Sequence, residues 1–506
     1  MSEIQEILQE NGIKILRSAE FGRYLVADRD VEPLSLILRE APIIYGPGDD
    51  DQEVHLGEFP MCLGCCVRLV KGQRCDLCGW PICGNRCQQM KIHAQYECDL
   101  FRKGNVTYPP PHTWLVINKS VLVLRCLLLK QTGQTDTWGK NVDALEHHTQ
   151  IRYKKSYCIK GDEMLLENLK YFLGPLKDDL RREIVKISGI INVNAFSTTS
   201  NSNNRNNVMI AQCIYGTASL FANSCIPNCT WRVEPPPSLQ ICVRSAVPIT
   251  KGEMITISYS PHDTLCGTLQ RQVSNEDVAH FICTCSRCKD PTEFGTFISA
   301  VKCCNCGNGN KGDEGFLLPL DPLVPESPWI CNSKSCDESQ SVHKIVAQTY
   351  PIQQMFEATK RSGLERCDEI KELKNILEVG KNIFHPNHYT LQDIRMHIVK
   401  RQIPVVSYLS GTELTYVIHQ TKVLLNMANI LAPGFSQIRA LLQHFLAQEL
   451  QALQKKDATQ PDADKSQCNS MVQCLERNAL LFFQHHNFHS ENDTIIKIIQ
   501  DSLKIG

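Results

Sequence analysis

The sequence predicts an α+β protein, in which a β-rich part that contains many cysteines is followed by an all-α part. Three observations carry this prediction. Short apolar runs typical of strands lie between Gly12 and Tyr45 and again between residues 239 and 259. Cysteines occur in closely spaced groups between residues 62 and 336. From about residue 341 onward, apolar residues recur at helical spacing.

Net charge and hydropathy argue against a nucleic-acid-binding protein and against a membrane protein. The 506 residues carry a formal net charge of −1, which gives no electrostatic reason to expect specific nucleic-acid binding. The most apolar run, Leu115–Leu129, is interrupted by Lys119 and Arg125 and is too short to span a bilayer. The polar stretch from Met1 to Ile13 does not resemble a signal peptide. We therefore expect no membrane partner and an intracellular location, in the cytoplasm, the nucleus or both.

The 26 cysteines are the strongest chemical indication. In a large chain of a reducing compartment, clustered cysteines are typical of metal sites; the alternative is a disulfide-rich secreted protein. Between residues 62 and 98, seven cysteines and one histidine stand at the spacing of two closed, tetrahedral zinc sites. So short a segment buries little apolar surface, and zinc binding is expected to supply its folding free energy. These ligands are Cys62, Cys65, Cys75, Cys78, Cys83, Cys87, His93 and Cys98.

Two more cysteine groups follow. Cys283, Cys285 and Cys288 offer three thiolates, so a zinc ion there needs a fourth ligand. Cys225 is the obvious candidate. The last group has the character of a zinc ribbon, with loose buried thiols as the alternative, and the whole chain is expected to bind three or four structural zinc ions. That last group consists of Cys303, Cys306, Cys331 and Cys336.

The remaining elements follow from periodicity. Phe21-Gly22-Arg23 precedes the first strand, and a glycine there either lets a ligand approach the backbone or makes a turn. Apolar faces at helical spacing predict a helical insert before residue 190 and stacked helical hairpins after residue 341. The predicted strands are residues 25–27, 36–38, 239–244 and 254–259, and the predicted helices include residues 119–130, 162–172, 178–188 and 413–431.

Together these motifs resemble the SMYD family, in which a SET methyltransferase domain is split by a MYND zinc finger. Asn194-Ala-Phe196 and Ser219–Cys229 look like its cofactor-binding core, and Gly252–Tyr259 looks like the strand that ends in the active-site tyrosine. Cys283–Cys288 resembles the post-SET zinc knuckle, and His385–Tyr389 resembles a segment of the C-terminal domain. Within the family, the chain is most similar to the arthropod SMYD-A (msta-like) branch.

The resemblance covers nearly the whole chain. It implies a β-rich SET domain split by a MYND finger, then a post-SET zinc region and a C-terminal all-α helical domain. The expected divisions are residues 1–58 (SET N-terminal part), 59–98 (MYND finger), 99–190 (helical SET insert), 191–262 (SET core), 263–340 (post-SET cysteine-rich region) and 341–506 (C-terminal helical domain). Cross-bracing in MYND fingers implies one zinc ion on Cys62, Cys65, Cys83 and Cys87 and another on Cys75, Cys78, His93 and Cys98.

The resemblance also implies an activity, the transfer of a methyl group from S-adenosylmethionine to a lysine of a protein substrate. The lysine must arrive neutral, which an apolar channel favours, and the methyl group must be held in line with its nitrogen. Tyr259 is expected to orient the amine, and Phe281 is expected to pack against the adenine of the cofactor. The other expected cofactor contacts are Gly22, Arg23, Asn194, Ser219 and Asn223.

The sequence departs from the family pattern near this site. Ala222 and Asn223 stand where the family has Asn-His, Tyr24 replaces a glycine, and Ala279 stands where a second tyrosine is expected. Losing charge-assisted hydrogen bonds of about 1.5–3 kcal/mol each would weaken cofactor binding. The alternative function is therefore a non-catalytic interaction protein. MYND fingers in general dock short proline-containing peptides, and in this finger Trp80 and the region Cys83–Cys87 are expected to line the groove.

Overall fold

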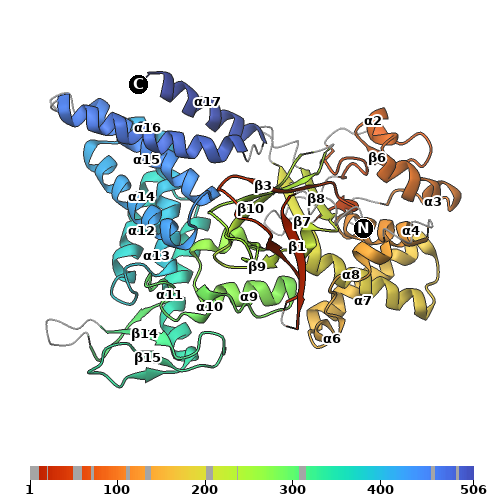
Figure 1. The fold of residues 1–506 in the computed structure, drawn as a ribbon, viewed down its shortest axis with the longest axis horizontal. Coiled ribbons are helices and arrows are strands. Elements are labelled where there is room, and N and C mark those ends of the chain that lie inside the picture. Colours follow the sequence, from red (N-terminus) through yellow and green to blue (C-terminus); the bar gives the residue numbers. More distant parts are fainter. Residues whose placement is uncertain are drawn as a thin grey trace.

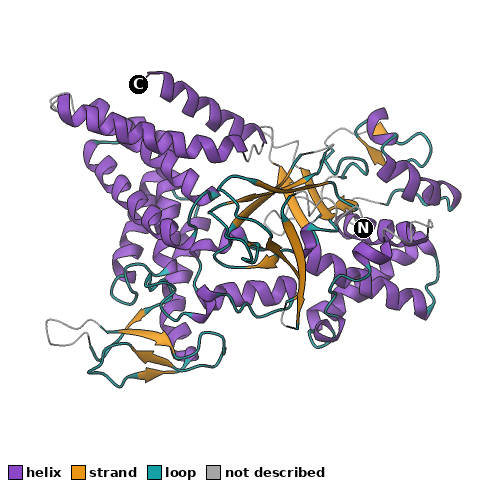
Figure 2. Cartoon of the chain, viewed as in Figure 1, coloured by secondary structure: helices purple, strands orange, loops and turns teal. Residues whose placement is uncertain are grey.

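The computed structural model places several small β-sheets between two helical regions (Figure 1). The finger (residues 60–103) and the helical insert (residues 114–194) lie on one side of these sheets, and the tail (residues 342–505) lies on the other. Strands are confined to the centre, the finger and a separate ribbon (residues 301–340), as Figure 2 shows. The structure describes residues 11–19, 21–48, 60–69, 73–109, 114–131, 138–200, 209–235, 238–306, 315–456, 462–485 and 489–505.

The central sheets are short and mostly antiparallel. β1 and β2 form a hairpin in which Ile13 pairs with Ala27. In β2, buried and exposed residues do not alternate strictly, because the end of the strand, from Leu25 on, packs into the core. Two three-stranded sheets have the orders β10-β11-β3 and β4-β8-β7. Their strands are β1 Ile13–Ser18, β2 Gly22–Ala27, β3 Leu36–Glu40, β4 Ile44–Pro47, β7 Phe196–Ser200, β8 Met209–Ile214, β10 Cys229–Val233 and β11 Ile241–Ser245.

One parallel pair joins two segments that are central to the site. β9 (Ala222–Asn223) pairs with β12 (Thr256–Ile257), and Ser224 N–H extends the pairing by donating to Ile257 O at 2.9 Å. The strand predicted over residues 254–259 is therefore shorter than expected, and Tyr259 follows it. Because Tyr259 lies beyond the end of β12, the strand pairing does not fix the direction of its side chain.

The helical insert packs beneath these sheets. α4 is apolar on nearly all sides because it is buried by the sheets and by its neighbouring helices. α8 is amphipathic, with Ile184, Ile187 and Ile191 on its buried face. The three predicted helices are present here and are longer than predicted. The elements are α4 Trp114–Gln131, the π-helical turn η4 Trp138–Val142, α6 Thr149–Arg152, α7 Ser156–Leu173 and α8 Asp178–Asn194.

The finger and the ribbon are small and irregular, as expected of segments that depend on metal for folding. The finger contains one two-stranded sheet and three helical turns. The ribbon is a four-stranded antiparallel sheet in sequence order. The finger elements are β5 Gln73–Arg74, β6 Pro81–Ile82, α2 Asn85–Gln88, η2 His93–Glu97 and α3 Cys98–Lys103; the ribbon strands are β13 Val301–Lys302, β14 Phe316–Pro319, β15 Trp329–Cys331 and β16 Ser339–Gln340.

The tail consists of helical pairs with their own apolar cores. α14 begins with a capping box, in which the Ser410 hydroxyl and the Glu413 carboxylate exchange hydrogen bonds with each other's backbone N–H. Its predicted apolar face, including Leu424, is buried. The helices are α11 Val342–Arg361, α12 Arg366–Gly380, α13 Tyr389–Gln402, the 3-10 turn η7 Ile403–Tyr408, α14 Gly411–Leu431, α15 Gln437–Lys456, α16 Asp462–His485 and α17 His489–Ile505.

A glycine brings the tail against the central sheets. Gly434, between α14 and α15, has φ +73°, and a Cβ there would lie 1.9 Å from Ala246 O. Phe435 N–H donates to the same carbonyl at 2.9 Å. Only glycine accommodates both the positive φ and this close approach. The loop therefore packs the tail against Ala246, the residue that follows β11.

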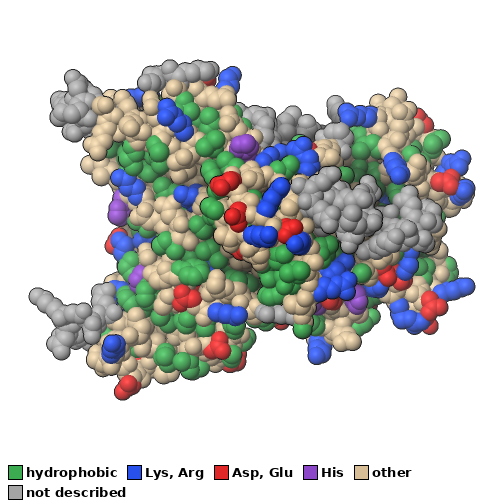
Figure 3. Space-filling model, in the orientation of Figure 1, with side chains coloured by type: hydrophobic (Ala, Val, Ile, Leu, Met, Phe, Trp, Pro, Cys, Tyr) green, Lys and Arg blue, Asp and Glu red, His purple; other side chains and the backbone are tan. Residues whose placement is uncertain are grey.

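The surface charge and the helix lengths are relevant to whether the protein binds nucleic acid or a membrane. On the face drawn in Figure 3, acidic and basic side chains are interspersed among hydrophobic ones. Among the described residues, no helix combines the length and the apolar character needed to cross a membrane. The first predicted division, between residues 58 and 59, falls in residues 49–59, outside the described part of the chain. The other divisions stay predictions.

A buried carboxyl group in the tail makes a pH prediction. Glu449 of α15 is fully buried, accepts from Thr421 Oγ1 at 2.8 Å, and burial raises its pKa to about 8. Between about pH 4.5 and pH 8 the unfolded chain loses this proton and the folded chain keeps it, so stability falls with rising pH, by on the order of 4 kcal/mol at pH 8. Glu449→Gln should therefore raise the melting temperature at pH 8 and change it little at pH 4.5. Equal changes at both pH values would contradict this.

Candidate active site and metal centres

A 3-10 turn, η5 (Ala218–Leu220), begins the segment that carries the site. Its amide groups are capped from β3, because the Glu40 carboxylate accepts hydrogen bonds from the N–H groups of Gly216, Thr217 and Ala218 at 2.9–3.2 Å. Burial raises the pKa of Glu40, and these amide contacts only partly offset the effect. The turn therefore leads into β9 in a defined conformation.

Tyr259 is held at both ends by the segment that follows this turn. Its backbone N–H donates to Asn223 Oδ1 at 2.9 Å, and its hydroxyl donates to Phe221 O at 2.7 Å. Its ring meets Phe281 edge-on, with the centroids 6.0 Å apart. Burial, followed by the charge of Cys283, raises the pKa of Tyr259 to about 12. The hydroxyl is therefore neutral near pH 7, and its oxygen has lone pairs left to accept a further hydrogen bond.

The polar side chains of Asn194 and Ser219, predicted to bind the cofactor, each have a partner within the protein. Asn194, at the end of α8, donates to Glu146 O at 2.7 Å and to Ile190 O at 2.9 Å. The Ser219 hydroxyl donates to Tyr215 O at 2.7 Å. They shape the backbone of the site; their direct contact with a cofactor stays a prediction.

The predicted glycine leaves open space at the start of β2. Gly22 has φ +63°, and no atom lies within 4 Å of the position that a Cβ would occupy. The neighbouring Arg23 Nη2 donates to Ala144 O at 3.2 Å. Two features here suit S-adenosylmethionine: the backbone is approachable at the exposed Gly22, and the Phe281 ring is only partly buried. Its polar contacts would come mainly from backbone groups, because the side-chain amides are already bonded.

The departures from the family pattern are visible here. The position of the expected second tyrosine is occupied by Ala279, which is buried and offers no hydroxyl to the site. His280 does not replace it, because its Nδ1 lies 3.0 Å from Glu276 O at the end of α9 (Thr268–Ala279). The Tyr24 ring packs edge-on against Phe21, with centroids 5.9 Å apart.

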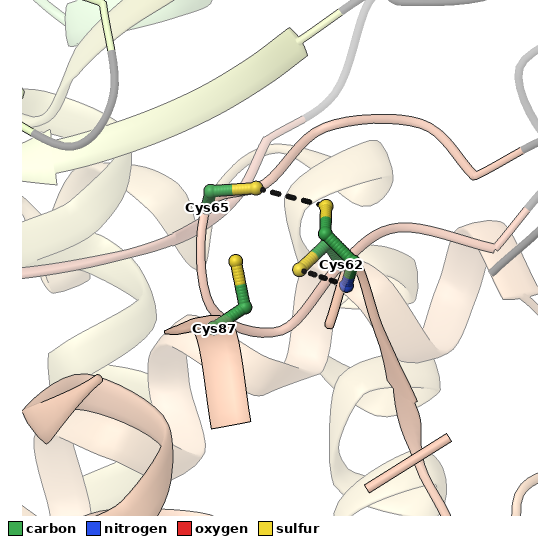
Figure 4. Close-up of side chains that lie close together, drawn as sticks. Cys62, Cys65 and Cys87 are labelled. Atoms are coloured by element: carbon green, nitrogen blue, oxygen red, sulfur yellow. Dashed lines mark hydrogen bonds between the residues drawn. The ribbon is translucent and has the colours of Figure 1, made fainter. Parts of the chain in front are cut away.

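All four groups of predicted metal ligands come together. Within each group the ligand atoms lie within 4.8 Å of one another, and all 26 cysteines are free thiols. Figure 4 shows Cys62, Cys65 and Cys87 turned toward one another. The groups are Cys62, Cys65, Cys83 and Cys87; Cys75, Cys78, His93 and Cys98; Cys225, Cys283, Cys285 and Cys288; and Cys303, Cys306, Cys331 and Cys336.

The spacing within these groups suits zinc. Four sulfurs about 2.3 Å from a tetrahedral zinc ion lie roughly 3.8 Å apart. The observed separations include 3.7 Å for Cys75 and Cys98, 3.6 Å for Cys225 and Cys288, and 3.8 Å for Cys303 and Cys336. Four protein ligands close each site, so these zinc ions are structural and leave no position for a reacting water.

A buried ion pair that the sequence analysis missed attaches the finger to the insert. Arg125 of α4 and Glu97 of the finger are both fully buried, and Arg125 Nε donates to Glu97 Oε2 at 3.0 Å. Glu97 Oε1 lies 3.0 Å from His93 Nδ1, which leaves His93 Nε2 directed at the metal group. Burial alone would raise the pKa of Glu97, and Arg125 and His93 outweigh it, so this pKa is lowered. In the sequence, the indication of this ion pair was Arg125 itself, a charged residue inside the apolar run 115–129.

A second buried network supports the knuckle (residues 283–288). Glu293 accepts from both Arg271 and Arg287, at 2.6 and 2.9 Å, and all three side chains are almost fully buried. Arg271 Nη2 also donates to Cys288 Sγ at 3.4 Å. A zinc ion with four thiolates carries a net charge of −2, so two adjacent guanidinium groups with one carboxylate offset half of it.

A cleft of about 530 Å³ runs between the central sheets and the tail, beside Tyr259. Asn223, Ser258 and Ser260, which flank the tyrosine, line it on one side. Polar residues of the opposite walls include Asn275 and Asp393, and burial raises the pKa of Asp393 to about 6. The apolar lining consists of Trp231, Met396, Leu431, Ile438, Leu441 and Phe482, among others.

The expected role of Trp80 is wrong. Its side chain is fully buried, stacks on Phe101 at 4.1 Å and donates from Nε1 to Val106 O at 2.8 Å. The aromatic cluster of Trp80, Phe101 and Phe172 instead joins the finger to α7. Among the described residues of the finger, Leu77 is an exposed apolar side chain, 60% exposed.

Comparisons with known proteins agree with this geometry. The SET domain family profile matches residues 22–260. The Drosophila melanogaster SET domain-containing protein SmydA-8, isoform B, is 25% identical over 402 residues, which cover 78% of this chain and 81% of that protein. The Arabidopsis thaliana histone-lysine N-methyltransferase ASHR1 is 24% identical over 423 residues, covering 80% and 81%. The Mus musculus protein-lysine N-methyltransferase SMYD4 is 23% identical over 211 residues, covering 41% of this chain and 25% of that protein.

The matched residues contain the site. Gly22 begins the SET match, Tyr259 lies at its end, and the two closed metal groups of the finger interrupt it. The knuckle and the helical tail follow in the order that the resemblance implied. Whether the chain lies in the arthropod branch stays a prediction. The chain thus contains a SET domain match that a metal-binding finger divides, and it is similar to SMYD-type proteins, over most of its length in the case of SmydA-8.

Proposed function

We propose that this chain is a protein-lysine N-methyltransferase that uses S-adenosylmethionine. The single observation that carries the proposal is the placement of Tyr259, whose backbone and hydroxyl are both held while its oxygen can still accept a hydrogen bond. Accepting one N–H of the incoming amine would aim the nitrogen lone pair, which is mainly a positioning effect. S-adenosylmethionine supplies the methyl group on a sulfonium centre.

The residues around Tyr259 favour a neutral amine. A lysine ammonium has no lone pair, and partial burial beside the Phe281 ring favours loss of its proton. Because the pKa of Tyr259 is raised to about 12, the tyrosine stays protonated and does not serve as the base near neutral pH. The proton therefore leaves to solvent before transfer.

The cleft suits a polypeptide substrate. It reaches Ser258 and Ser260, on both sides of Tyr259 in the chain, and its lining contains both apolar and polar side chains. A chain segment bound there would bring a lysine of the substrate protein to the tyrosine.

Cofactor binding tests the proposal, and two glycines provide the variants. Gly22→Ala places a methyl group in the open space at β2, and we expect the affinity for S-adenosylmethionine to fall about tenfold or more in calorimetry. Gly252→Ala is the matched control, because Gly252 also has a positive φ and open space but is not a predicted cofactor residue. Both substitutions should strain the backbone by a similar amount, about 1 kcal/mol.

Two outcomes would contradict the proposal. Zinc-loaded wild-type protein that releases no heat with high micromolar S-adenosylmethionine would favour the non-catalytic interaction protein instead. Equal affinity losses in both glycine variants would show that strain, and not a blocked site, is responsible.

We also propose that the finger binds proline-containing peptides. The exposed Leu77, next to the metal ligand Cys78, gives such a peptide an apolar contact in place of the buried Trp80. Leu77→Ser should abolish binding of a proline-containing peptide library, and unchanged binding would refute this site.

An intracellular location, in the cytoplasm or nucleus, is proposed as well. The support is chemical, since every one of the 26 cysteines is a free thiol and the fifteen cysteine metal ligands depend on this state. Detection of the native protein in the secreted fraction only would overturn it.

A further inference from the structure

Asn223 bridges the knuckle and Tyr259. Its Oδ1 accepts from Tyr259 N–H at 2.9 Å, and its Nδ2 donates to Cys283 Sγ at 3.5 Å. Both ends of the side-chain amide are therefore used within the protein, whereas the sequence analysis expected this side chain to bind the cofactor. Through these two hydrogen bonds, the amide connects a metal-ligand sulfur with the backbone of the tyrosine.

The sulfur at one end of this bridge is rigidly placed. Gln272 of α9 bonds the Cys283 backbone twice: its Oε1 accepts from Cys283 N–H at 2.8 Å, and its Nε2 donates to Cys283 O at 2.7 Å. Cys225, two residues beyond Asn223, belongs to the same metal group. Zinc would therefore fix the position of Asn223 both through the chain and through its side chain.

The tyrosine at the other end has few other restraints. Its residue is 36% exposed, and its second hydrogen bond, to Phe221 O, goes to the same three-residue segment as Asn223. Trp231 Nε1 restrains the preceding carbonyl of Ser258 at 2.8 Å but does not contact the tyrosine ring. A shift of residues 221–223 would thus move both anchors of Tyr259 together.

We propose that Asn223 is a positioning residue, which transmits the placement of the zinc-bound Cys283 to Tyr259. An amide donor to a thiolate stabilises the negative charge on sulfur, so the same group also strengthens the metal site. The inference goes beyond the proposed function and rests on it only for the role of Tyr259.

Zinc release and kinetics test this inference together. In Asn223→Ala, extraction of one zinc ion by a chromophoric chelator should become about tenfold faster, because outer hydrogen bonds typically change metal affinity by 10–100-fold. The kcat for methyl transfer should fall about tenfold, while the Kd for S-adenosylmethionine should change less than about twofold. Mass spectrometry of the native protein counts the zinc ions that remain.

Asn223→Asp separates the two ends of the bridge. Its carboxylate still accepts from Tyr259 N–H, so kcat should fall less than in Asn223→Ala. It also places a negative charge beside the thiolate, so zinc release should be at least as fast as in Asn223→Ala. Because aspartate has nearly the same shape as asparagine, this variant stays informative if the alanine variant folds poorly.

Asn228→Ala is the matched control. Asn228 is a buried amide of the same stretch, and it bonds Thr256 N–H and Met254 O without touching a metal-ligand sulfur. It should lower stability but leave the rate of zinc release near the wild-type value.

Two results would overturn the inference. A rise in the Kd for S-adenosylmethionine of about tenfold with unchanged zinc release would make Asn223 a direct cofactor ligand. Unchanged zinc release and unchanged kcat would show that the bridge has no role. The zinc measurement needs no methyl transfer, so a wild-type chain that binds no cofactor would contradict the proposed function and still leave this test readable.

Discussion

Replacing Arg125 by methionine is expected to lower the free energy of unfolding of the finger and its docking surface by about 3–5 kcal/mol. The substitution leaves the Glu97 carboxylate fully buried with His93 as its remaining ionisable partner. It also removes the donor to Tyr45 O, at 2.9 Å, on β4. Urea unfolding and limited proteolysis of the finger would measure the effect.

An exposed ion pair of the same finger provides the control. Arg102 pairs with Asp99 at 2.6 Å, with side chains 55% and 45% exposed. Arg102→Met should change the free energy of unfolding little, since solvent screens exposed charges. If Arg125→Met costs no more than Arg102→Met, the buried pair does not hold the finger in place. Arg125→Met combined with Glu97→Gln should recover part of the loss, because the uncompensated charge is gone.

Tyr259→Phe is expected to reduce kcat for methyl transfer about 100-fold or more, with little change in the Kd for S-adenosylmethionine. The ring and its contact with Phe281 remain, and only the oxygen that orients the amine is lost. The protein should stay folded, because Phe221 O loses a single partner at a partly solvated position. Mass spectrometry of a methylated substrate protein would measure the rate.

Tyr171→Phe is the matched control, because the Tyr171 hydroxyl also donates to a backbone carbonyl, that of Thr107, but on the distant α7. Its kcat should equal that of the wild type. The pH profile adds a second check. Since the pKa of Tyr259 is about 12, the rate should rise as the substrate amine loses its proton and show no downturn from tyrosinate formation below about pH 11. A downturn near pH 9 would contradict the neutral hydroxyl.

Local spacing indicated most of the metal ligands. Cys283, Cys285 and Cys288 lie so close in sequence that their thiolates must converge, and Cys225 completes the set. The same holds for the ribbon, where the wide spacing of Cys331 and Cys336 still forms a compact group. Helical periodicity likewise predicted α4, α7, α8 and α14, because a buried face imposes its pattern on the sequence.

The spacing of residues along the sequence did not predict the direction in which the Trp80 and Asn223 side chains point. Trp80, expected at the surface, is buried against Phe101 because the finger packs on α7, and that contact depends on a helix about 80 residues later in the chain. Asn223 was expected at the cofactor and is bonded to Cys283 and Tyr259 instead. Its two partners lie about 36 and 60 residues away, so no local pattern contains them.

By itself, the sequence indicated the metal ligands of the finger and the knuckle, because most of them are cysteines at short spacing, and its resemblance to SMYD proteins pointed to Tyr259. Only the tertiary structure decided that Arg125 and Glu97 join the finger to the insert and that Asn223 links a metal ligand to the tyrosine. The physical reason is that a buried polar group must find its partner wherever the fold places one, and that partner is chosen by packing over long separations.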